Sequence, residues 1–180
     1  PMKGHKNFIK EAIKVAISWL KLNRIYAKYR VLRGQNVSHL LISERAGRFS
    51  KIYESSVWLN DRASGALSGI GSEIKNTNNI RNELPVTLLK LGATSLLDIG
   101  CGDLTWVRQT KLPCSYVGAD IVSSVIEKNR SEFSFQDKRF IVLDAVTDII
   151  PECDVILCRE ILFHLSFEDI QSLITNILKS

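Results

Sequence analysis

The chain has 180 residues, of which 45% are hydrophobic and 24% are charged, a composition that excludes a disordered or collagen-like protein. Its formal net charge of +5 is unevenly distributed. Residues 1–33 contain nine of the 24 basic residues and one of the 19 acidic residues, so the remainder carries 15 basic and 18 acidic groups. The body of the chain is therefore not basic, which argues against a nucleic-acid partner.

Residues 8–33 are predicted to form a basic amphipathic helix, because apolar residues recur three and four positions apart and lysines fill the other side. Lys10, Glu11 and Lys14 interrupt the apolar run, so it is neither a membrane span nor a signal peptide. We favour an apolar face covered by protein. The alternative is weak contact with an anionic membrane surface, with Trp19 near the interface. The apolar positions are Ile9, Ala12, Ile13, Ala16, Ile17 and Leu20.

The four cysteines form no CxxC pair and no Cys/His spacing suited to zinc. We therefore expect no metal site, and reduced thiols in a cytoplasmic protein. The cysteines are Cys101, Cys114, Cys153 and Cys158.

Residues 34–75 have no clear periodicity, and we group them with residues 1–33 as a helical N-terminal extension, residues 1–75. Within it, SGALSGIGS, residues 64–72, predicts a loop or the start of a helix, and a flexible connector is its simplest interpretation. Residues 79–91 predict a helix in which Pro85 marks a kink or a later start.

Residues 76–180 alternate between strand-like and helix-like segments. This alternation predicts an α/β domain with a parallel sheet and right-handed crossovers. Ser166 is expected to cap a final helix. The expected strands are residues 95–99, 115–119, 140–143 and 154–158, and the expected intervening helices are residues 104–111 and 123–133.

A glycine turn, DIGCGD, follows the first expected strand. Gly100 and Gly102 allow the backbone to turn tightly and to approach a ligand closely. A dinucleotide motif would need a third glycine, where Thr105 stands. Asp98 and Asp103 flank the glycines, and their carboxylates would repel a diphosphate but tolerate a sulfonium or an ammonium group. The turn therefore favours S-adenosylmethionine over NAD.

Two further aspartates follow the next two expected strands. Asp120 stands about 20 residues beyond the first strand, where an acid binds ribose hydroxyls, and we favour this role over a helix N-cap before Ser123. Asp144 stands where an adenine amino group could be met, with Ala145 or Leu143 packing on the ring. Turn formation is an equal alternative for Asp144.

The segments LLDIGCGD, YVGADI, FIVLDAVTD and DVILCREILFHLS resemble motifs I to IV of class I S-adenosylmethionine-dependent methyltransferases, over residues 95–178. The resemblance implies a Rossmann-like methyltransferase fold with S-adenosylmethionine as the cofactor. The cofactor-binding residues expected on these grounds are Asp98, Gly100, Cys101, Gly102, Asp103, Asp120, Ile121, Asp144, Ala145 and Arg159.

The family sheet has seven strands, of which strands 1 to 4 are expected here and strands 5 to 7 are not. We therefore expect a C-terminally truncated chain whose fourth strand is left as an unpaired edge, and which is aggregation-prone and inactive by itself.

Residues 48–72 also resemble the lead-in of a bacterial methyltransferase group associated with surface-glycan synthesis, through RFSKIYESSVW and SGALSGIGS. This second resemblance implies that the glycine- and serine-rich loop covers the cofactor and is not a plain connector. The residues of this cover would be Trp58, Ser64, Gly65, Gly69, Gly71 and Ser72.

The candidates for catalysis after the fourth expected strand are Arg159, Glu160 and His164. His164 has a pKa suited to a general base, although it could equally pack at the start of a helix. Arg159 could hold a substrate carboxylate or phosphate, or pair with Glu160 or Asp154. The Asn/Asp-Pro-Pro-Tyr signature of enzymes that methylate nucleic-acid amino groups is absent, since Cys-Arg-Glu stands in its place.

Together these features predict a methyltransferase that acts, without a metal, on a hydroxyl of a glycan or a similar small polar acceptor. The alternatives are an N-methyltransferase for a small molecule or a protein, and a catalytically silent cofactor-binding module. No nucleic-acid partner is expected.

Overall fold

The computed structural model describes residues 22–59, 65–133 and 138–180. The chain divides into two compact units, Pro1–Lys51 and Ile52–Ser180. Residues 52–75, which the sequence groups with the N-terminal extension, thus belong to the second unit.

The first unit contains helix α2, Asn23–Leu32, the 3-10 turn η1, Ser38–Leu41, and the beginning of helix α3, Arg45–Glu54. α2 packs against η1, with Ala27 as its buried residue. The Glu44 carboxylate accepts the Ala46 N–H at 2.7 Å and so satisfies a free donor in the first turn of α3. The predicted helix over residues 8–33 is confirmed for Asn23–Leu32, whereas residues 8–21 lie outside the described residues.

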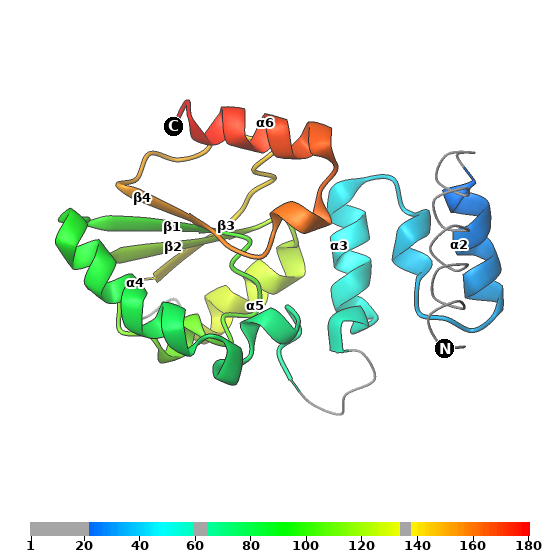
Figure 1. Ribbon diagram of the computed structural model, residues 1–180, viewed down its shortest axis with the longest axis horizontal. Helices are drawn as coiled ribbons and strands as arrows, with labels where there is room; N and C mark the ends of the chain where they lie inside the picture. The colour runs from blue at the N-terminus through cyan, green and yellow to red at the C-terminus, as the bar shows by residue number, and fades with distance from the viewer. Residues whose placement is uncertain (1–21, 60–64, 134–137) are drawn as a thin grey trace, which may run out of the picture. The chain divides into compact units, whose positions relative to one another are not determined.

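The second unit is built on a parallel four-stranded sheet in the order β3-β2-β1-β4 (Figure 1). The sequence prediction of a parallel, Rossmann-like α/β sheet is confirmed, and each strand begins and ends within two residues of its expected bounds. Asp98 in β1 stands opposite Gly118 in β2 and Leu157 in β4. Among the described strands, β4 pairs only with β1, so it forms an edge. The strands are β1, Ser95–Ile99; β2, Ser115–Asp120; β3, Lys138–Val142; and β4, Val155–Cys158.

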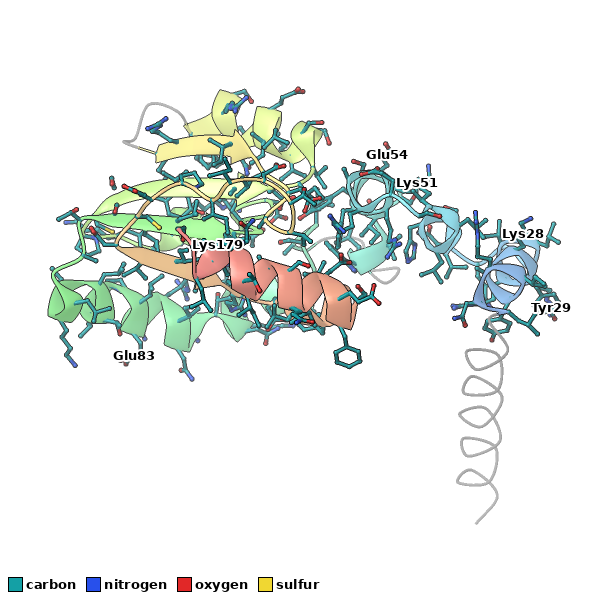
Figure 2. The ribbon with its side chains drawn as sticks, turned by 90° about the horizontal axis from the view of Figure 1, so that it is seen from above. Lys28, Tyr29, Lys51, Glu54, Glu83 and Lys179 are labelled. Atoms are coloured by element: carbon teal, nitrogen blue, oxygen red, sulfur yellow. The ribbon has the colours of Figure 1, made fainter. Side chains whose placement is uncertain are left out.

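Helices cover both faces of this sheet: α4, Asn78–Leu91, and α5, Ser123–Phe133, lie on one side, and α6, Phe167–Ile177, lies on the other (Figure 1). The helix predicted over residues 79–91 is confirmed as α4, and it begins at Asn78, so Pro85 does not mark a later start. Its outer side carries exposed residues such as Glu83 (Figure 2). α6 begins as predicted, because the Ser166 hydroxyl accepts the Asp169 N–H at 3.1 Å.

The expectation of a helix at residues 104–111 is wrong. Only a 3-10 turn, η5, Val107–Gln109, forms there. Leu104 adopts a left-handed conformation, with φ +54°, and the Asp103 carboxylate takes the Thr105 N–H. Both features divert the backbone from an α-helix immediately after the glycine turn.

The core lies on both faces of the sheet because side chains alternate along each strand. In β1, Leu96 faces α4 and α5, and Leu97 faces α6. Full burial of each such leucine stabilises the fold by about 1.5–3 kcal/mol. The core facing α4 and α5 is formed by Leu88, Leu96, Cys101, Leu104, Trp106, Val107, Tyr116, Ile126 and Phe140. The core facing α6 is formed by Leu97, Ile99, Ala119, Leu143, Ala145, Ile150 and Leu173.

Candidate ligand site at the glycine turn

The strand order places a switch point between β1 and β4. The chain moves from β1 to β2 and β3 on one side of the sheet, and then returns to place β4 on the other side of β1. Ligands of open α/β sheets bind outside the carboxyl ends of the strands at such a point. The segments that leave β1, β2 and β4 here contain most of the residues selected from the sequence.

Both glycines of the turn are required by their backbone conformation and by their neighbours. Gly100 and Gly102 have φ of +73° and +58°, in the left-handed region that favours glycine. A Cβ on Gly100 would lie 2.6 Å from Ile161 Cδ1, and one on Gly102 would lie 2.7 Å from Ser68 Cβ. The tight turn expected from the sequence is confirmed.

Asp120 joins the turn after β1 to the turn after β2. Its Oδ2 accepts the Gly102 N–H at 3.0 Å, and its Oδ1 accepts the Val122 N–H at 3.0 Å. Burial raises the pKa of Asp120, and the N–H groups of Val122 and Gly102 oppose this shift. Ile121, half-buried, follows it at the same edge. The ribose-binding role of Asp120 remains a prediction, and ordering the glycine turn is a second role that the sequence did not indicate.

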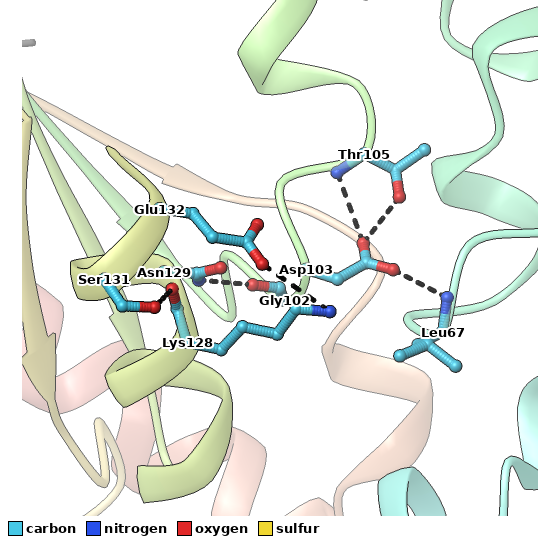
Figure 3. Close-up of polar contacts among 8 residues, drawn as sticks. All are labelled: Leu67, Gly102, Asp103, Thr105, Lys128, Asn129, Ser131 and Glu132. Atoms are coloured by element: carbon cyan, nitrogen blue, oxygen red, sulfur yellow. Dashed lines mark hydrogen bonds and ion pairs between the residues drawn. The ribbon is translucent and has the colours of Figure 1, made fainter. Parts of the chain in front are cut away.

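Asp103 fastens the glycine- and serine-rich loop to the glycine turn. Its Oδ2 accepts the Leu67 N–H at 2.6 Å. Its Oδ1 accepts the Ser68 hydroxyl at 2.7 Å and the Thr105 hydroxyl at 2.8 Å. Figure 3 shows the Asp103 carboxylate between Leu67 and Thr105. These bonds contradict the simple connector interpretation of the loop, at least for its described part, residues 65–72; Ser64 lies outside the described residues.

A second anchor, at the residue that follows β4, holds the same loop. Arg159 Nη2 donates to the Gly71 carbonyl at 2.7 Å and lies 3.9 Å from Glu160 Oε1. Its guanidinium carbon lies 5.8 Å from the centroid of the Trp106 ring. Of the two ion pairs considered from the sequence, Glu160 is thus the observed one, whereas Asp154 accepts hydrogen bonds from the residues that begin β1. Arg159 therefore holds the loop, and its contact with the cofactor or the substrate remains a prediction.

Asp98 is buried beneath the turn and accepts the Tyr116 hydroxyl at 2.8 Å. Burial raises the pKa of Asp98 to about 7; the hydrogen bond from Tyr116 opposes the shift, the charge of Asp120 adds to it, and the charge of Arg159 opposes it. Near neutral pH, Asp98 is therefore partly protonated. This corrects the sequence argument, which assumed a full negative charge at Asp98 to repel a diphosphate.

Three residues that the sequence analysis did not select also form this site. Asn129, buried in α5, donates to the Gly102 carbonyl at 2.8 Å (Figure 3). Tyr116 is the partner of Asp98. Tyr53 places its hydroxyl 3.1 Å from where a Cβ on Gly102 would stand. Burial raises the pKa of Tyr53 well above its usual value, and the charges of Asp120 and Asp103 add to this. Tyr53 and Tyr116 had a sequence signal, as parts of the segments KIYESSVW and YVGADI, whereas Asn129 had none.

Cys101, between the two glycines, is buried, and its Sγ lies 3.9 Å from Asn129 Nδ2. Burial raises the pKa of the Cys101 thiol well above its usual value, and the charges of Asp120 and Asp98 add to this. The side chain is therefore a neutral packing group beneath the turn.

His164 ends the 3-10 turn η6, Leu162–His164. Its ring lies 4.9 Å from the Trp58 ring and 4.3 Å from the Phe163 ring, centroid to centroid. Trp58 in turn packs edge-on against Tyr53 at 5.5 Å. Burial lowers the pKa of His164, and Glu160 partly opposes this, so the imidazole is neutral at pH 7. It belongs to an aromatic cluster, as the packing alternative expected, and it retains the protonation state that a base needs.

Asp144 forms a turn after β3. Its Oδ1 accepts the Val146 N–H at 3.1 Å, and its own N–H donates to Asp148 Oδ2 at 2.8 Å. Ala145 is buried in the core that faces α6. The turn-forming alternative is observed, and contact of Asp144 or Ala145 with an adenine remains a prediction.

Within residues 22–59, 65–133 and 138–180, no group of three or more His, Cys, Asp or Glu side chains could hold a metal ion. None of the helices in these ranges is both long enough and apolar enough to cross a membrane.

No protein-family model matches the chain, and no curated protein matches it. Similar solved structures include a TehB-like SAM-dependent methyltransferase from Corynebacterium glutamicum, with a TM-score of 0.41, covering 57% of this chain and 64% of that one. They also include the N-methyltransferase NodS from Bradyrhizobium japonicum, with a TM-score of 0.44 and coverages of 57% and 62%. A third is human N-acetylserotonin methyltransferase in complex with SAM, with a TM-score of 0.42 and coverages of 81% and 49%.

Sequence identity is 20% in each case, and the chain spans less than two thirds of each of these structures. The fold assignment rests on the strand order and register given above.

Proposed function

We propose that the glycine turn binds S-adenosylmethionine and that the chain is part of a methyltransferase. The observation that carries this proposal is the hydrogen bond from the Gly102 N–H to Asp120. In a dinucleotide site, backbone N–H groups of the glycine turn and of the following helix face the diphosphate. Here the Gly102 N–H faces a carboxylate, and the turn leads into η5 and not into an α-helix.

The charges around the turn suit a cationic ligand. Asp98, Asp103 and Asp120 lie close enough for their charges to interact. The charge of Asp120 raises the pKa of Asp98, and the charge of Asp103 raises the pKa of Asp120. S-adenosylmethionine carries a sulfonium and an ammonium group, and both would stabilise the ionised carboxylates. When bound, this cofactor supplies a methyl group activated by the positive sulfur.

The residues of the chain divide between three roles in this proposal. Asp120 binds the ribose hydroxyls while it orders the glycine turn. Asp103 and Arg159 hold the loop of residues 65–72 across the carboxyl end of the sheet, and so restrict water at the site. His164, neutral at pH 7, accepts the proton of a hydroxyl acceptor, which we propose to be a glycan or another small polar molecule.

Calorimetric titration of a full-length version of the protein, with strands 5 to 7 that the family resemblance implies, tests the cofactor. We expect S-adenosylmethionine and its demethylated product, S-adenosylhomocysteine, to bind and NAD not to bind. Binding of NAD without either S-adenosyl ligand would overturn the proposal.

The acceptor is tested separately on the same full-length protein, by transfer of a labelled methyl group to a panel of hydroxyl and amine acceptors. His164→Asn should retain S-adenosylhomocysteine binding and lose transfer to a hydroxyl by about 100-fold or more. Transfer only to amines would contradict the hydroxyl acceptor. Cofactor binding without transfer to any acceptor would indicate a binding module.

A further inference from the structure

One side of α2 exposes large apolar side chains. Ile25, Tyr29 and Leu32 have 65%, 55% and 86% of their surface exposed, and their spacing of four and three residues places them on one side of the helix. Leu22 and Tyr26 extend the same side. We call these five residues the α2 apolar face. The buried residue of α2, Ala27, lies on the opposite side of the helix.

Basic residues border the α2 apolar face. Lys28 and Arg30 lie at its two edges, and Arg33 lies at the C-terminal end of the helix. Figure 2 shows Lys28 and Tyr29 projecting outward from α2. The Arg30 guanidinium is fixed beside the face, since its Nε donates to Gln35 Oε1 at 2.6 Å and its Cζ lies 5.9 Å from the Tyr26 ring centroid.

The sequence around α2 is nearly free of acidic residues. Residues 22–43 contain no Asp or Glu, and residues 1–21 add five lysines and a single acid. A surface with exposed apolar groups between basic edges fits the boundary between the headgroups and acyl chains of a membrane, where Tyr is favoured and Lys and Arg reach the phosphates.

We propose that α2 lies on an anionic lipid membrane, with Ile25, Tyr29 and Leu32 entering the headgroup region. For α2 this replaces the protein-covered face that we favoured from the sequence for residues 8–33. A nucleic acid would be attracted by the basic edges but would leave the row of apolar side chains without a counterpart. A neutral protein groove would cover the α2 apolar face, but it would gain no electrostatic attraction from the basic residues that border this face. This proposal is independent of the cofactor proposed for the glycine turn.

Cosedimentation of the full chain with vesicles tests the proposal. One vesicle preparation is phosphatidylcholine alone, and the other contains phosphatidylserine as about a third of its lipid. We expect binding to the anionic vesicles only, weakened by high salt. Leu32→Ser and Lys28→Glu should each reduce the partition coefficient about fivefold or more.

Matched controls come from the second unit. Leu178→Ser removes a leucine that is 81% exposed, and Lys179→Glu reverses an exposed charge. Both should leave vesicle binding unchanged, and circular dichroism should show that all four variants keep their helix content. Deletion of residues 1–21 should weaken binding without abolishing it.

Several results would overturn the proposal. One is absence of binding to anionic vesicles, and another is an equal effect of Leu32→Ser and Leu178→Ser. Complete loss of binding on deletion of residues 1–21 would assign the attraction to that segment. Tight RNA binding that Lys28→Glu weakens and Leu32→Ser does not would indicate a nucleic acid. Self-association without vesicles, lost in Leu32→Ser, would indicate a second copy of the chain.

Discussion

The Asp103 carboxylate accepts the Ser68 hydroxyl at 2.7 Å and thereby joins a loop to a glycine turn 35 residues away in the sequence. The same carboxylate accepts the Leu67 N–H, and Arg159 holds Gly71 a few residues further along the loop. Asp103 and Arg159, which are expected to contact the cofactor, thus also hold the loop of residues 65–72, which is expected to cover the cofactor.

Asp103→Asn should loosen the loop and weaken ligand binding. An amide offers one acceptor oxygen where the carboxylate uses two, so the N–H of either Leu67 or Thr105 loses its acceptor, at a cost of about 1.5–3 kcal/mol in unfolding free energy. Amide hydrogen exchange at Leu67 or Thr105 should become faster, and the affinity for S-adenosylhomocysteine should fall about tenfold.

Asp154→Asn is the matched control for this change. Asp154 also accepts several hydrogen bonds, from Thr94 and Ser95, but it lies at the amino end of the strands. It should leave exchange at Leu67 and ligand affinity unchanged. Equal effects of the two variants on ligand affinity would show that Asp103 acts only through general stability.

Gly100→Ala should be more harmful than Gly92→Ala. Both glycines have positive φ, +73° and +65°, so both substitutions strain the backbone, by about 1–2 kcal/mol. A Cβ on Gly92 meets nothing within 4 Å, whereas one on Gly100 meets Ile161 at 2.6 Å, which adds about 1–3 kcal/mol of overpacking. Urea unfolding measures the difference, and equal losses would mean that Ile161 moves aside freely.

Asp98 should make the protein less stable as pH rises from about 4 to about 7. The folded chain holds a proton on Asp98 up to its pKa of about 7, whereas the unfolded chain releases it near 3.8. Between these values the folded state binds more protons, so stability falls with pH, at up to about 1.4 kcal/mol per pH unit. Burial raises the pKa of Asp120 as well, so Asp120 acts in the same direction.

The difference between the wild type and Asp98→Asn isolates the contribution of Asp98. Denaturant unfolding at several pH values in this window should give a flatter dependence for the variant. Parallel pH profiles would show that the Asp98 carboxyl is already ionised in the folded protein.

Asp120→Asn should weaken ligand binding through the ribose. The wild type should bind adenosine more tightly than 2′,3′-dideoxyadenosine, since the hydroxyls donate to the carboxylate, and the variant should lose most of this discrimination, about 1–3 kcal/mol. A purely structural role for Asp120 would lower both affinities together and keep their ratio. That outcome would leave the aspartate as a support for Gly102 and Val122 only.

The sequence by itself determined the four strands and the helices α4, α5 and α6. β1 and β2 are mainly apolar runs with mostly buried side chains, α5 and α6 have apolar periodicity, and α6 begins at a serine cap. The two glycines of the turn were also readable, because few other residues adopt a positive φ without strain. Local chemistry controls these features, so a single sequence contains them.

The tertiary structure alone decided what the aspartates bind. Asp103 reaches Ser68, and Asp120 reaches Gly102, only after parallel strands have brought distant turns to the same edge of the sheet. The protonation of Asp98 likewise depends on burial beside Tyr116, which no residue spacing reveals. The absence of the helix expected at residues 104–111 has the same origin. Asp103 is held by a long-range hydrogen bond, and Leu104 is left-handed. Such tertiary contacts exceed the few tenths of a kcal/mol per residue that helix propensity supplies.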